Sequence, residues 1–144
     1  MHAAPAPVAV KVIGAALAAS SLGAGVWALR TFDPNVQGNP FLPCLFNLFT
    51  GLFCPGCGAT RALHALVHFD LPGALSMNPL LVLLLPTMPA LVAWSKGWRP
   101  RVLAPVLAPV MRVVGQPALW LVLIPAYWIA RNLPWAPLSW MAPG

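Results

Sequence analysis

Charge is scarce in this chain of 144 residues, and acidic charge is almost absent. Only 7% of the residues are charged, and eight lysines and arginines stand against two acidic residues. Soluble domains usually carry about 25% charged residues, so this chain could not cover a water-exposed surface with polar groups. A disordered chain is excluded as well, because disorder requires high charge and low hydrophobicity.

The lack of acidic residues also limits the chemistry. Asp33 and Asp70 are the only acids, and we find no carboxylate pair, Ser-His-Asp set or glycine-rich phosphate loop, so most hydrolase and phosphotransfer mechanisms lack their residues. The formal charge of +6 comes from scattered basic residues, which do not form the basic patch of a nucleic-acid-binding protein. That excess suits contact with anionic lipid headgroups instead.

Hydrophobic residues are abundant, at 60% of the chain with a mean hydropathy of +0.80. We therefore predict an all-α integral membrane protein, a single domain over 1–144. Three apolar runs, at about 8–29, 79–95 and 113–130, have the roughly 20 residues that span a bilayer. The first run could instead be a cleaved signal peptide, but it continues well past the about 7–15 apolar residues of such a segment, which favours a retained anchor.

The second and third runs have recognisable ends. Asn78 can cap a helix that starts at Pro79, where the missing N–H of proline costs nothing. Two prolines further along predict a kink near Leu85. Arg131 ends the third run, and the tail at 135–140 carries tryptophans typical of a membrane-interface anchor.

The segment 31–78 between the first two runs has a more mixed composition. Turn residues alternate with apolar and aromatic ones, which indicates a membrane-surface loop that is partly immersed. Its stretch 60–69 is free of glycine and proline, and predicts a short interfacial helix with Thr60 as its cap. On that helix Arg61, His64 and His68 would share one face.

The basic residues predict the orientation. With the N-terminus in the cytoplasm, five of the eight basic residues are cytoplasmic, and the connector 96–112 contributes most of them. This places the protein in the inner membrane with the loop 31–78, and all three cysteines, on the extracytoplasmic side.

The loop contains the one concentration of reactive side chains. Cys54 and Cys57 form a C-x-x-C pair, and Cys44 lies ten residues upstream. If a helix starts at Thr60, Cys57 lies just before its N-terminus and close to Arg61. Both features stabilise a thiolate, so Cys57 would be the more acidic of the two sulfurs.

Three interpretations of this motif remain open. A redox-active or structural disulfide fits an oxidising compartment. A zinc or iron site could use Cys54, Cys57, His64 and His68, although their spacing is shorter than in zinc fingers. The sequence could also be no more than a tight turn that leads into a helix. Covalent haem is disfavoured, because Gly58 stands where that motif needs histidine, and the sequence identifies no cofactor.

The motif belongs to a longer ordered string: Pro43-Cys44, Thr50-Gly51, Cys54-Pro55-Gly56-Cys57-Gly58, Thr60-Arg61-Ala62, Asp70, Ala74 and Asn78-Pro79. The string resembles the bacterial family of unknown function numbered 2752, small membrane proteins with a CPGCG-x-TRA motif, a Gly-Asp turn and an Asn-Pro-led helix. The resemblance covers about residues 40–90. It implies that Cys54, Cys57, Thr60, Arg61 and Asn78 are signature positions, without implying an activity. Phe69 departs from the pattern, since the family commonly has glycine before the aspartate. The turn at Asp70 is therefore expected to be less tight than in the family.

Two functions follow as hypotheses. The favoured one is a non-enzymatic accessory or assembly subunit, whose loop packs within a larger membrane complex or a homo-oligomer. The alternative is a thiol–disulfide or metal-handling protein that uses Cys54 and Cys57. In either case Arg61 is expected to donate to loop carbonyls or to pair with Asp70.

Overall fold

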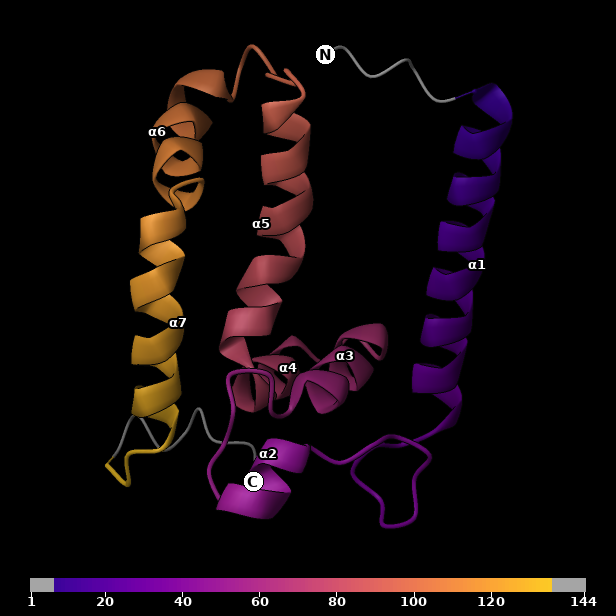
Figure 1. Ribbon diagram of the computed structural model, residues 1–144, viewed down its shortest axis with the longest axis vertical. Coiled ribbons are helices and arrows are strands. Elements are labelled where there is room, and N and C mark those ends of the chain that lie inside the picture. The colour runs from indigo at the N-terminus through magenta and orange to yellow at the C-terminus, as the bar shows by residue number, and fades with distance from the viewer. Residues whose placement is uncertain (1–6, 136–144) are drawn as a thin grey trace.

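The computed structural model describes residues 7–135 and is built from helices alone over that range (Figure 1). The all-α class predicted from the sequence is confirmed for this part of the chain. In chain order the helices are α1 Val8–Thr31, α2 Leu45–Thr50, α3 Ala59–Val67, α4 Leu71–Met77, α5 Pro79–Ser95, α6 Ala104–Val114 and α7 Pro117–Arg131.

One described helix, α1, is long and apolar enough to cross a bilayer by itself. The pairs α4 with α5 and α6 with α7 pass the same test together, but they are bent by 108° and 69° at their breaks. Residues 7–135 therefore contain one candidate span, or up to three if each bent pair counts as one.

The third predicted run, 113–130, is not one continuous helix. Helix α6 ends at Val114 and α7 begins only at Pro117. Gln116 between them is extended, with ψ 121°, because a residue before proline is sterically pushed out of the helical region. By contrast, α5 has the predicted bounds and continues through its two internal prolines. Of the predicted aromatic tail, 136–140 lies outside the described residues.

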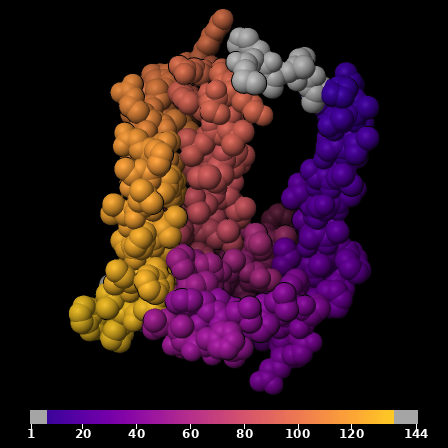
Figure 2. Space-filling view, in the orientation of Figure 1, coloured from indigo at the N-terminus to yellow at the C-terminus, as the bar shows by residue number. Residues whose placement is uncertain are grey.

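The helices divide into a long set and a short set (Figure 1). Helices α1, α5 and the pair α6–α7 run along the length of the molecule, while α2, α3 and α4 gather at one end. Helix α1 packs on α3, and α3 packs closely on α4. Figure 2 shows open space between α1 and α5 above that end, and α1 has no buried residue.

Side-chain caps fix the chain where α3 turns into α4 and α5. The Asp70 carboxylate accepts the Gly73 N–H at 2.9 Å, and the Asn78 side chain accepts the Leu81 N–H at 3.0 Å. The cap predicted for Asn78, with Pro79 as the first helical residue, is thus confirmed, and Asp70 caps α4 in the same way. Phe69, where the related family commonly has glycine, adopts φ 62° and is the one described non-glycine residue with positive φ.

The predicted cap at Thr60 is wrong. Helix α3 begins one residue earlier, at Ala59, and its N-cap is Gly58 with φ 77°. Glycine adopts this left-handed conformation at little steric cost, so the chain can turn into α3 directly after the cysteine pair. Thr60 consequently lies inside the first helical turn.

Candidate functional site

The CPGC segment forms a tight turn that brings two sulfurs together. The Cys57 N–H donates to the Cys54 carbonyl at 3.1 Å, and the two Sγ atoms are also 3.1 Å apart. The Cys54 N–H donates to Cys57 Sγ at 3.0 Å. Pro55 presets its φ angle for such a turn and Gly56 adds no side chain, which explains why the sequence bends here.

Cys44 joins the pair from a separate segment. It is the N-cap of α2, and the chain returns from that short helix through Gly51, which has φ 71°. This return places Cys44 Sγ 3.4 Å from Cys54 Sγ. All three Sγ atoms lie within 4.8 Å of one another. The separations exceed the about 2.05 Å of a disulfide, so all three cysteines are free thiols.

A buried arginine holds the backbone of this turn. Arg131, at the end of α7, is only 1% exposed. Its guanidinium donates to four carbonyl oxygens, those of Cys54 at 3.4 Å, Pro55 at 3.2 Å, Cys57 at 3.0 Å and Met77 at 3.1 Å. The planar guanidinium, with five donors in a fixed arrangement, is suited to joining several carbonyls in this way.

Asn78 holds the same turn from the start of α5. Its Nδ2 donates to the carbonyls of Pro55 at 3.0 Å and Cys57 at 3.2 Å. Its Oδ1 accepts the Leu81 N–H and the Tyr127 hydroxyl. The side chain is 1% exposed, and both its donors and its acceptor are used, as a buried amide requires. Asn78 is therefore a structural centre of the site as well as a helix cap.

The sequence prediction of an acidic Cys57 thiol is wrong. Burial, followed by hydrogen bonding with the other two cysteines, raises the pKa of Cys57 to about 12. The backbone N–H of Asn47, at the start of α2, is the main cause that lowers the pKa of Cys44. Cys57 is only 5% exposed, so the loss of hydration at this sulfur outweighs the nearby start of α3.

The two histidines of the predicted metal set lie elsewhere. His64 Nδ1 is 2.7 Å from the Leu29 carbonyl, and His64 Nε2 is 3.9 Å from Asp33. His68 Nδ1 is 2.8 Å from the His64 carbonyl. Among the described residues, the group that could hold a metal consists of the three cysteines. Gly58 is left-handed, so Cys57 does not continue the helical phase of α3, and the structure does not bring the two histidines of the predicted set to the thiols.

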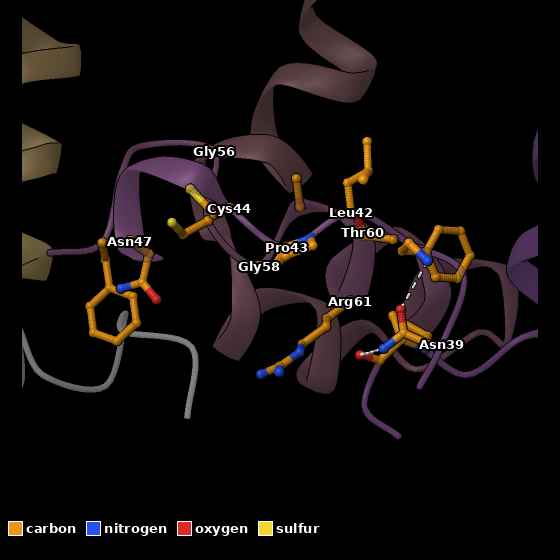
Figure 3. Close-up of a pocket in the computed structure, with 14 residues that line it drawn as sticks. Asn39, Leu42, Pro43, Cys44, Asn47, Gly56, Gly58, Thr60 and Arg61 are labelled. Atoms are coloured by element: carbon orange, nitrogen blue, oxygen red, sulfur yellow. Dashed lines mark hydrogen bonds between the residues drawn. The ribbon is translucent and has the colours of Figure 1, made fainter. Parts of the chain in front are cut away.

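Arg61 and Thr60 line a cavity of about 550 Å³ that also borders Cys44 and Cys57 (Figure 3). Within residues 7–135, the side-chain hydrogen bonds to the CPGC carbonyls come from Arg131 and Asn78. No ion pair joins Arg61 to Asp70 in this part of the chain. Donation to the loop carbonyls, which the sequence predicted for Arg61, is thus made here by Arg131.

Residues 44–92 match the model of a family described as Protein of unknown function (DUF2752). The match confirms, over this segment, the resemblance found in the sequence. No curated protein and no solved structure matches the chain. The DUF2752 segment contains the three thiols and Asn78, whereas Arg131 lies 39 positions beyond its end at 92.

Proposed function

We propose that this protein is a metal-handling membrane protein that holds a thiophilic metal ion between Cys44, Cys54 and Cys57. The observation that carries the proposal is the convergence of three sulfurs from two separate segments within 4.8 Å. Zinc–sulfur bonds of about 2.3 Å in a tetrahedron require sulfurs about 3.8 Å apart. The observed 3.1 and 3.4 Å need only small outward shifts to reach that spacing.

A disulfide fits the same atoms less well. One pair would have to approach by more than about 1 Å to reach bonding distance, and the third thiol would be left without a partner. An exchange-active thiol also needs access and thiolate character, and Cys57 is buried with a raised pKa. Thiol–disulfide chemistry therefore remains the alternative, for which the partly exposed Cys44 with its lowered pKa is the best nucleophile.

The proposed setting is the bacterial inner membrane, crossed by α1 and by the two bent helix pairs. The basic connector 96–112 supports a cytoplasmic N-terminus, which places the thiols on the extracytoplasmic side. A role as an accessory subunit, in a larger complex or a homo-oligomer, is a second candidate function. It is favoured by α1, an apolar helix whose faces are unburied over its whole length.

The test is elemental analysis of the full-length protein, purified in detergent without chelator. We expect near-stoichiometric zinc or iron, and its loss in Cys44→Ser, Cys54→Ser and Cys57→Ser alike. His68→Ala is the matched control, because this exposed histidine lies outside the cysteine group, and it should retain the metal. A metal-free protein with a mass two hydrogens below the reduced form would contradict the proposal and support a disulfide.

A further inference from the structure

We propose that the three-cysteine site is an open one, in which a divalent ion keeps a fourth coordination position that faces the cavity and exchanges water for a small external donor. The inference rests on the metal function proposed above and goes beyond it, because it states how the site is used. It follows from the supply of ligands, from the surroundings of the sulfurs and from charge.

The described residues offer three ligands at this site, the sulfurs of the three cysteines. Zinc-type ions in closed structural sites take four protein ligands, whereas sites with three protein ligands keep water or substrate in the fourth position. The other described side chains that could bind such an ion are already engaged. His64 and His68 contact backbone carbonyls, Asp33 accepts from Asn35, and Asp70 caps α4. A fourth ligand must therefore come from outside this part of the chain.

The surroundings leave room for that ligand. Cys44 and Cys57 both border the cavity of about 550 Å³, and the wall beside them includes Gly56 and Gly58 (Figure 3). These two residues present backbone alone, so no side chain of theirs covers the sulfurs. The volume lies within the range of about 300–1,000 Å³ that is typical of small-molecule sites.

Charge favours a divalent ion with a neutral fourth ligand. Arg131 is a buried cation beside the CPGC carbonyls, and its Nε has no hydrogen-bond partner among the described residues. Asp33 and Asp70, the only acidic side chains of the chain, are engaged elsewhere. A buried charge is costly unless it is compensated. Three thiolates with one divalent ion carry a net charge of −1, which Arg131 balances when water completes the site.

The experiment uses the full-length protein in detergent, loaded with Co²⁺ as a spectroscopic probe. Thiolate-to-cobalt charge-transfer absorption reports the three-cysteine site itself. Titration with imidazole, a neutral donor, and with azide, an anionic one, then reports the fourth position. We expect a saturable shift of the visible cobalt bands with imidazole, the neutral donor, and a much weaker response to azide, because Arg131 balances only one negative charge. A stronger response to azide than to imidazole would contradict the charge argument.

Gly56 offers matched variants for the cavity. A Cβ at this position would lie 3.8 Å from Cys54 Sγ, an ordinary contact. Gly56→Ala should therefore keep both the charge-transfer absorption and the ligand response, while Gly56→Leu, which projects further, should keep the former and weaken the latter at least tenfold. Charge-transfer absorption without any ligand response in the unaltered protein would show a closed site and overturn this inference alone. No charge-transfer absorption at all would overturn the metal proposal and this inference with it.

Discussion

Substitution of Arg131 by methionine is the most direct test of how the site is held. The change keeps an unbranched apolar stem and removes all four hydrogen bonds to the loop and to α4. A hydrogen bond to a charged group contributes about 1.5–3 kcal/mol. The four do not add in full, because the carbonyls of Pro55 and Cys57 keep Asn78 as a donor and the Cys54 carbonyl keeps the Cys57 N–H.

Methionine also removes the cost of burying a cation. We therefore expect a net loss of about 2–3 kcal/mol, which corresponds to a fall of roughly 10 °C in Tm for a chain of this size. Thermal unfolding followed by circular dichroism in detergent measures it. Arg112→Met is the control, since Arg112 is exposed near the end of α6, and it should leave Tm within about 2 °C. Equal melting of the two variants would refute the structural role of Arg131.

Four further outcomes are expected. Phe69→Gly should raise the free energy of unfolding by about 1 kcal/mol in the same assay. A Cβ in the left-handed region costs about 1–2 kcal/mol, whereas the conformational entropy that glycine loses on folding costs about 0.5–1 kcal/mol. Phe69→Ala, which keeps the Cβ, should show no such gain. Alkylation of metal-free protein, followed by mass spectrometry, should label Cys44 before Cys57, because the pKa of the first thiol is lowered and that of the second is raised; equal rates would contradict the burial argument. Zinc affinity, measured by competition with a chelator, should rise about tenfold or more per pH unit between about pH 6 and 8, because binding displaces thiol protons, and a flat profile would count against thiolate ligands. Reporter fusions after residue 98 should be cytoplasmic and those after 36 extracytoplasmic, and the reverse pattern would invert the proposed topology.

Local signals in the sequence were sufficient for the helices whose ends are chemically marked. The Asn78-Pro79 pair predicts the start of α5 because its side-chain acceptor and its missing N–H both satisfy a helix N-terminus, and the structure shows that start. The α6–α7 break was not predicted, since apolar residues continue on both sides of it. Only the steric effect of Pro117 on Gln116 separates the two helices.

The N-cap of α3 was assigned to Thr60 from residue preference alone, and the structure has Gly58 there. Threonine is a good N-cap, but the left-handed conformation of Gly58 starts α3 earlier. The same glycine lies between Cys57 and the helix that carries His64 and His68. Side-chain direction on a helix follows a fixed step of about 100° per residue, so it cannot be extended through a left-handed residue to place Cys57 beside the histidines.

Cys44 and Arg131 are visible in the sequence, but their roles at the site depend on contacts between distant positions that no local pattern predicts. Cys44 reaches Cys54 only because α2 and Gly51 reverse the chain. Arg131 comes from the far end of α7 to carbonyls 74–77 positions away. A signal for Arg131 did exist: an ionisable residue at the end of an apolar run, in a chain with only two acids, usually has a specific polar partner inside the protein. In this chain backbone carbonyls take the place of the scarce carboxylates, and the positive charge that they leave unneutralised is the reason to expect an anionic metal–thiolate group beside them.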